Sequence, residues 1–175
     1  MIYYRDETIC VRTMLEPDPE IFSREEIAQG WIHATPEKCR RRIQHEKEGM
    51  AVALTAEYKG QPAGYVSLYW QPKTGAFAGC GIPEIVDFAV LAKYRKLGVG
   101  TKLMDTAEKV AAKVSDRVYL GVGLHKDYGS AQRMYVKRGY IPDGSGVWYR
   151  DEVCTPYAPC CNDDDLVLYL SKDLS

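Results

Sequence analysis

A short apolar strand, a glycine-containing turn and an amphipathic helix follow one another between residues 84 and 114. The segment EIVDFAVL (84–91) is β-branched and apolar, which predicts a central strand. The next segment, KYRKLGVG (93–100), contains three cations and two glycines. Apolar side chains then recur at helical spacing through residues 101–114. This order favours folds in which helices cover a sheet, that is, a mixed α/β or α+β class.

The remaining patterns extend this arrangement along the chain. Strands are predicted at residues 8–14, 50–60, 62–70, 117–124, 147–153 and 165–174, and helices at 19–31, 35–48 and 130–140. Asp18 is predicted to cap the first of these helices, and Lys59-Gly60-Gln61 to turn a hairpin. PDGSG (142–146) is predicted to be a turn. With 175 residues and no linker-like segment, the chain is expected to form one domain, residues 1–175.

The overall charge argues against several partners. Formal net charge is −1, from 23 basic and 24 acidic side chains, so no basic field favours nucleic acid or an anionic membrane. The first ten residues, MIYYRDETIC, lack the pattern of a signal peptide, and no apolar run is long enough to span a bilayer. We therefore expect a cytoplasmic protein.

Six cysteines lie at positions 10, 39, 80, 154, 160 and 161, and no pair has CxxC spacing. The three histidines are distant in sequence from the cluster at 154–161. Reduced, partly buried thiols are therefore favoured over a zinc site, and no metal is expected.

The glycine-containing turn has the properties of an anion-binding site. Gly98 and Gly100 lack a Cβ atom, so the backbone there can approach a ligand closely. The helix that follows has N–H groups without intrahelical partners and a dipole that is positive at this end. Arg95 and Lys96 add positive charge. These features suit a phosphate or pyrophosphate, although an ordinary turn before a helix stays open, and neither a P-loop nor a complete GxGxxG motif is present.

Two motifs resemble those of the GCN5-related N-acetyltransferases. RKLGVG (95–100) fits the family pattern R/Q-x-x-G-x-G/A, and the apolar Val90 stands five residues before Arg95, as in that family. The second family signature is similar to YGSAQRMYVKRGY (128–140), which places Ala131 and Tyr135 in register. One departure is Tyr128, which stands where the family often has a cofactor-contacting Asn.

The resemblance implies a fold, a co-substrate and its binding residues. The fold would be a mixed, mostly antiparallel sheet flanked by about four helices, and dimers are common in the family, which allows a homodimer here. Acetyl-CoA would be the acyl donor. Its pyrophosphate would bind the backbone N–H groups of Lys96, Leu97, Gly98, Val99, Gly100 and Thr101, with Arg95 assisting, and its pantetheine arm would pair with the backbone of Phe88, Ala89 and Val90.

Three side chains are candidates for acid and base chemistry. Tyr135 matches the family tyrosine that protonates or hydrogen-bonds the coenzyme sulfur, and a phenol is protonated at neutral pH. Glu84 matches a general-base glutamate in the histone-acetylating branch, and Asp87 is its rival. Strand alternation places the two carboxylates on opposite faces unless a bulge intervenes.

Other polar segments receive simpler interpretations. KCRRR (38–42) is read as a solvated helix face, NDDDL (162–166) as a cap or solvated turn before the last strand, and His125 as a loop residue near the cofactor.

The resulting hypothesis is an acetyl-CoA-dependent N-acetyltransferase that acts on a primary amine by direct attack on the thioester. Polyamines, amino acids, aminoglycosides and protein N-termini all stay open as acceptors. The alternative hypothesis is a non-catalytic acyl-CoA sensor or scaffold.

Overall fold

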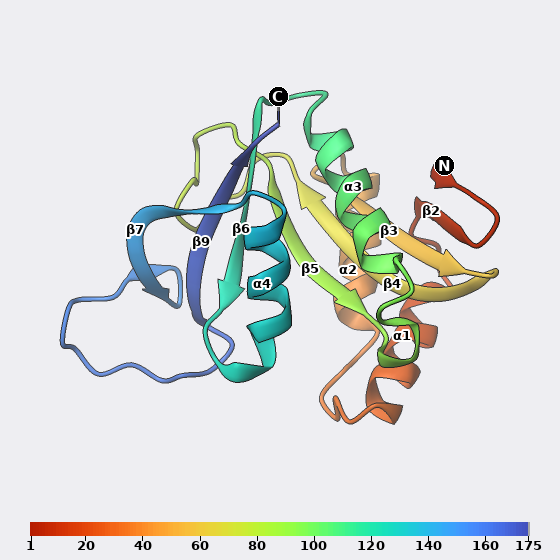
Figure 1. The fold of residues 1–175 in the computed structure, drawn as a ribbon, viewed down its shortest axis with the longest axis horizontal. Helices are drawn as coiled ribbons and strands as arrows, with labels where there is room; N and C mark the ends of the chain where they lie inside the picture. Colours follow the sequence, from red (N-terminus) through yellow and green to blue (C-terminus); the bar gives the residue numbers. More distant parts are fainter. Residues whose placement is uncertain (175) are drawn as a thin grey trace. The chain divides into compact units, whose positions relative to one another are not determined.

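The computed structural model describes residues 1–174, which form two compact units (Figure 1). The first unit contains residues 1–69 and 86–110, and the second contains residues 70–85 and the chain from Ala111 onward. Strand β5 (Glu84–Val90) contributes residues to both units. The expectation of one domain stays a prediction. Among residues 1–174, no helix is long and apolar enough to cross a membrane.

The first unit is built on neighbouring strands in the order β1-β2-β3-β4-β5. Their bounds are β1 Ile2–Arg5, β2 Ile9–Thr13, β3 Ala51–Tyr58 and β4 Gln61–Tyr69, followed by the later residues of β5. Strands β1 to β4 pair antiparallel. Three helices belong to this unit: α1 (Asp18–Ala28), α2 (Glu37–Lys47) and α3 (Val99–Ala111).

The helices of the first unit cover both faces of its strands. The ring of Tyr65 in β4 packs on Phe22 of α1, with ring centroids 4.8 Å apart. Gly64 points to the other face, where a Cβ atom on it would lie 3.2 Å from Leu103 of α3. Strand alternation therefore separates α1 and α2 from α3, as Figure 1 shows. Buried apolar residues such as Met14, Cys39 and Leu91 complete the core on the α1–α2 side.

The second unit has the strand order β5-β6-β9-β7-β8. Its further strands are β6 (Arg117–Gly123), β7 (Ile141–Tyr149), β8 (Glu152–Val153) and β9 (Leu166–Asp173), and its helix is α4 (Gly129–Lys137). The pair β5–β6 is parallel, and the pairs β6–β9, β9–β7 and β7–β8 are antiparallel. With four α-helices in the described chain and mostly antiparallel strands, the predicted α+β fold class is confirmed.

Most predicted elements are present, with local corrections. The hairpin at Lys59-Gly60 is confirmed, and both residues have positive φ, 49° and 77°. PDGSG is not a turn between elements. It lies inside β7, where the pairing with β9 shifts between Pro142 and Val147. The two glycines of this segment have positive φ, so they let the strand bulge and then resume its ladder. Strand β1 was not predicted from the sequence.

The predicted N-cap role of Asp18 is wrong. Asp18 is the first residue of α1 and makes no side-chain cap. Its buried carboxylate instead accepts hydrogen bonds from Arg12 at 2.6 Å and from the Thr55 hydroxyl at 2.9 Å. An ion pair with a cation on β2 satisfies this carboxylate more completely than a cap would, because a buried charge needs an opposite charge as well as hydrogen bonds.

Candidate functional site

The predicted anion site begins where the chain enters α3. Lys96 and Gly98 have positive φ, 63° and 84°, and α3 begins at Val99, two residues earlier than predicted. The first bond of the helix joins the Lys102 N–H to the Gly98 carbonyl at 3.1 Å. N–H groups before that bond have no intrahelical acceptor, so this turn has the backbone arrangement that binds phosphate.

Gly100 has a packing role that the sequence did not reveal. A Cβ atom at this position would lie 3.0 Å from Cζ of Phe88 and 3.3 Å from Cγ2 of Val90. The missing side chain therefore lets the first turn of α3 lie close to β5. Arg95 is tied to the same strand, since its Nε donates to the Val90 carbonyl at 3.2 Å. Two predicted binding segments, 88–90 and 95–101, are thus held together within the first unit.

Strand β5 has an irregular backbone conformation at Asp87. This residue has a φ of 55°, which a non-glycine residue rarely adopts. Its carboxylate accepts from Nε of Arg42 at 2.5 Å, and both side chains are mostly buried. Arg42 also hydrogen-bonds the Tyr69 hydroxyl. Regular strand alternation does not hold at Asp87, because its φ is positive, so alternation alone does not place Glu84 and Asp87 on opposite faces.

Glu84 lies in the second unit, at the start of β5. The parallel ladder pairs it with Tyr119 of β6, and the next pair, Ile85 with Leu120, is the last in this register. Burial raises the pKa of the Tyr119 phenol above its usual range, and the negative charge of Glu84 raises it further. The pKa of Tyr169 is raised by burial and by Glu84 as well. Glu84 therefore lies among protonated phenols.

Tyr135 is buried on α4, with 6% of its surface exposed. Burial, and to a smaller extent Tyr128, raises the pKa of its phenol above the usual value near 10. The ring contacts Tyr140 edge-on, with centroids 5.8 Å apart. Tyr135 is therefore fully protonated at neutral pH, as a proton donor must be.

Tyr128, the departure from the family signature, has defined contacts. Its ring lies where a Cβ atom on Gly123 would be, and its hydroxyl donates to Asp164 at 2.9 Å. Nε2 of His125 lies 2.9 Å from the same carboxylate oxygen. His125 is thus a loop residue, as predicted. The segment NDDDL does more than cap a turn, because Asp164 also fixes the chain before α4.

The prediction of a solvated face for KCRRR is wrong for Lys38, Cys39 and Arg42. Lys38 donates to the Tyr65 hydroxyl at 2.9 Å, and that hydroxyl donates to the buried carboxylate of Glu26 at 2.6 Å. Cys39 is buried, which raises the pKa of its thiol to about 12. A signal was present in the sequence, because Lys38, Arg42 and His45 recur at spacings of four and three and so share one side of α2.

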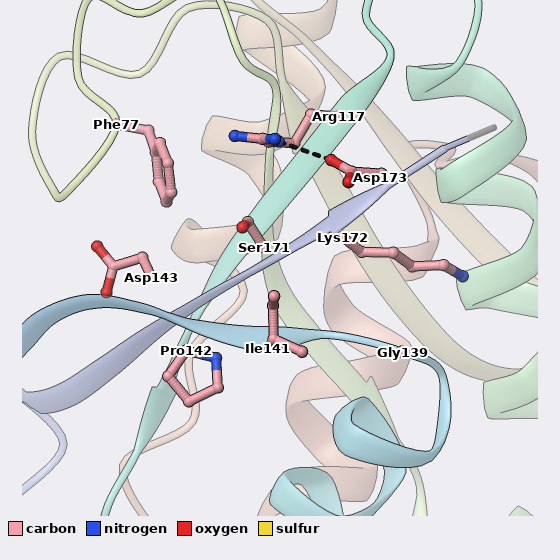
Figure 2. A pocket seen from close by; sticks show the side chains of 9 residues that line it. All are labelled: Phe77, Arg117, Gly139, Ile141, Pro142, Asp143, Ser171, Lys172 and Asp173. Atoms are coloured by element: carbon pink, nitrogen blue, oxygen red, sulfur yellow. Dashed lines mark hydrogen bonds and ion pairs between the residues drawn. The ribbon is translucent and has the colours of Figure 1, made fainter.

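A cavity of about 470 Å³ lies in the second unit (Figure 2). Its lining comprises Phe77, Arg117, Gly139, Ile141, Pro142, Asp143, Ser171, Lys172 and Asp173. Arg117 and Asp173 form an ion pair at 2.8 Å on its rim. None of the candidate catalytic or coenzyme-binding residues lines it.

Over residues 1–174, no group of three or more His, Cys, Asp or Glu side chains is placed to hold a metal ion.

The profile of the acetyltransferase (GNAT) family matches residues 12–140. The chain belongs to this family. A curated relative, an N-alpha-acetyltransferase of Sulfurisphaera tokodaii, is 30% identical over 124 residues, which cover 61% of this chain and 71% of that protein. The catalytic subunit NAA10 of the N-terminal acetyltransferase A complex of Arabidopsis thaliana is 30% identical over 100 residues, 56% of this chain and 50% of that protein. The chain therefore spans about half the length of this second relative.

A solved structure shows the same fold. The yncA protein of Salmonella typhimurium, solved with its cofactor acetyl-CoA, has a TM-score of 0.67 at 13% identity, and the match covers 97% of this chain and 95% of that chain. The predicted family, fold and co-substrate are confirmed. The protein is an acetyl-CoA-dependent N-acetyltransferase.

Proposed function

We propose that this acetyltransferase acts on the α-amine at the N-terminus of a peptide or protein. The observation that carries the proposal is that two relatives, each 30% identical to this chain, are named as N-alpha- or N-terminal acetyltransferases. Polyamines, free amino acids and aminoglycosides, which the sequence left open, have no comparable support.

In this proposal the first unit holds the coenzyme. Backbone N–H groups from Lys96 to Thr101 bind the pyrophosphate, which the positive φ of Gly98 and the start of α3 support. Arg95 adds charge near its bond to the Val90 carbonyl. The pantetheine arm pairs with the backbone of residues 88–90, beyond the point where the parallel ladder ends at Ile85. Acetyl-CoA supplies the activated acetyl group when bound.

The acid and base roles follow from the surroundings of three residues. The amine nitrogen attacks the thioester carbonyl carbon, the C–S bond breaks, and the sulfur takes a proton from the Tyr135 hydroxyl. Glu84 accepts the proton that the attacking amine loses. Asp87 is the weaker candidate for this base, because Arg42 binds its carboxylate at 2.5 Å. Such an ion pair stabilises the carboxylate and opposes its protonation.

The test is a panel of short peptides in a thiol-release assay with acetyl-CoA. Peptides with a free N-terminus should be acetylated on that amine, with the position assigned by fragmentation in a mass spectrometer. Matched peptides that carry a blocked N-terminus and an internal lysine should not react. Acetylation of the lysine peptides, or of polyamines alone, would overturn the choice of acceptor while leaving the family assignment intact.

The choice between the two carboxylates has its own experiment. Glu84→Gln should lower kcat/KM for the peptide, whereas Asp87→Asn should change mainly protein stability. The reverse result would assign the base to Asp87. A cytoplasmic location and a homodimer stay predictions, which cell fractionation and light scattering would check.

A further inference from the structure

The cavity of the second unit is lined by side chains from three strands and one loop. Arg117 comes from β6, Ser171 from β9 and Asp143 from β7, and the loop between β4 and β5 supplies Phe77. Figure 2 shows these four side chains around one space. At about 470 Å³, the cavity falls within the range of about 300–1,000 Å³ that small-molecule sites occupy. It therefore has room for a small ligand.

The pairing of the strands fixes the places of these side chains. Ser171 pairs with Tyr119 of β6 on one side and with Ile141 of β7 on the other. Phe77 packs on the same Tyr119, with ring centroids 4.8 Å apart, so its ring is held against the sheet. The walls of the cavity are thus set by the sheet ladder and by an aromatic contact.

Arg117 has the donors that a carboxylate group needs. Its Nε donates to Asp173 at 2.8 Å, and within residues 1–174 its two terminal nitrogens make no further ion pair or hydrogen bond. A planar guanidinium can bind a carboxylate through parallel N–H groups. The Ser171 hydroxyl lies in the same cavity and can donate as well. This side of the cavity is suited to a carboxylate.

Asp143 supplies the opposite charge. Its Oδ1 accepts from the Ser145 N–H at 3.1 Å, which orients the carboxylate and leaves Oδ2 for a ligand. Strand β9 lies between β6 and β7, so Asp143 and Arg117 stand on strands that are not neighbours. The Lys172 side chain points away from the space in Figure 2, and its Nζ lies 5.7 Å from the centroid of the Tyr140 ring. A ligand that contacts both Arg117 and Asp143 must therefore carry a carboxylate and an ammonium group.

Apolar side chains complete the lining. Ile141 has 65% of its surface exposed although it lines the cavity, and Phe77 is half-buried. An aliphatic group placed on these two side chains would remove apolar surface from water, which is favourable.

We propose that this cavity binds a free α-amino acid with an aliphatic side chain. The carboxylate of the ligand binds the Arg117 guanidinium and the Ser171 hydroxyl, its ammonium group binds Asp143, and its side chain packs on Phe77 and Ile141. None of these five residues belongs to the proposed coenzyme-binding or acid–base groups. Loss of amino acid binding would therefore leave the proposed acetylation of N-terminal amines untouched.

The test is an NMR titration of the full-length protein with L-leucine, in samples that carry the isotope label only in the δ1 methyl groups of isoleucine. The Ile141 resonance, assigned from its loss in Ile141→Val, should shift and saturate. Isocaproate lacks the amine of leucine and isoamylamine lacks its carboxylate, so each should bind at least about tenfold more weakly through the loss of one charge-assisted contact. An Ile141 resonance that leucine does not move, or an analogue that binds as tightly as leucine, would overturn the proposal.

Variants at the two charged positions assign the contacts. Arg117→Gln should weaken leucine binding about tenfold or more and leave isoamylamine binding unchanged, while Asp143→Asn should weaken leucine binding and leave isocaproate binding unchanged. Asp173→Asn is the matched control, because it breaks the same ion pair as Arg117→Gln but keeps the guanidinium. Leucine should bind this variant at least as tightly as it binds the wild type.

Two results with these variants would contradict the proposal. Equal losses in Arg117→Gln and Asp173→Asn would show that the ion pair only shapes the cavity and that Arg117 does not bind the carboxylate. Unchanged leucine binding in both Arg117→Gln and Asp143→Asn would place the ligand elsewhere on the protein. The remaining isoleucine methyl resonances verify that each variant is folded.

Discussion

The Tyr128 hydroxyl donates to the Asp164 carboxylate at 2.9 Å, across 36 residues of sequence. Tyr128 immediately precedes α4, the helix that carries Tyr135, and Asp164 lies just before β9. The family signature often has a cofactor-contacting Asn at this position, and in this chain the tyrosine joins two segments of the protein instead. The bond therefore gives the departure from the motif a structural role within the second unit.

The first prediction concerns acid stability at Asp164. Hydrogen bonds from His125, and then from Tyr128, lower the pKa of this carboxyl in the folded protein. Because its pKa is lower in the folded protein, the ionised Asp164 carboxylate contributes its full stabilisation above its unfolded-state pKa of about 3.9. That stabilisation is lost as the pH falls through the pKa of the folded state. Asp164→Asn should therefore cost stability at pH 7 and flatten the decline below about pH 4.

The size of this effect is limited because 78% of the Asp164 side chain is exposed. Solvent screening keeps it below about 1 kcal/mol. Urea denaturation at a series of pH values measures it, with Asp116→Asn, at an exposed position, as the control. Parallel pH curves for wild type and Asp164→Asn would contradict the prediction.

The second prediction concerns the coenzyme turn. Gly98 has a φ of 84°, and a Cβ atom there would meet only Ile9 at 3.6 Å, so Gly98→Ala introduces backbone strain without a clash. The variant should lose about 1 kcal/mol of stability and raise KM for acetyl-CoA about tenfold, equivalent to about 1.4 kcal/mol. Gly60→Ala is the matched control, because its φ of 77° lies in the hairpin between β3 and β4. An equal change in KM for both variants would show that strain alone is responsible.

The elements of this fold could be predicted largely because their signals are local. The hairpin at Lys59-Gly60 and the helix before Gly139 depend on turn chemistry and periodicity within a few residues. The positive φ of Asp87 and its ion pair could not be predicted, because the partner Arg42 lies 45 residues away. The bonds among Glu26, Tyr65 and Lys38 were also missed, because the spacing of Lys38 and Arg42 marks one side of α2 but does not identify the partners that this side contacts. The coenzyme-binding segments stay a prediction made from motifs, which record chemistry rather than packing.

The third prediction concerns the proton donor. Tyr135→Phe removes one hydroxyl from a buried ring, so it should lower kcat about 100-fold, in the range of general-acid catalysis, and leave KM for acetyl-CoA nearly unchanged. Steady-state kinetics with a peptide acceptor measures both constants. Tyr140→Phe removes a hydroxyl from the neighbouring ring and should retain most of the activity. If the two variants lost equal activity, packing rather than proton transfer would explain the result.

The fourth prediction concerns the ion pair between Arg42 of α2 and Asp87 of β5. Arg42 and Asp87 have only 16% and 20% of their side chains exposed, so removing one partner leaves the other charge poorly compensated. Arg42→Ala and Asp87→Ala should each cost about 2–3 kcal/mol of unfolding free energy, while the double variant costs less than their sum. The coupling energy from urea denaturation should exceed about 1 kcal/mol.

A matched cycle on Arg40 and Glu20 provides the control for this prediction. These side chains also form an ion pair in the first unit, but about half of each is exposed, 49% and 50%. Their coupling energy should stay below about 1 kcal/mol, because solvent screens exposed pairs. A larger coupling for the exposed pair would show that burial does not strengthen the contact between Arg42 and Asp87. Additive losses at Arg42 and Asp87 would show that the strand itself, and not α2, holds the irregular conformation at Asp87.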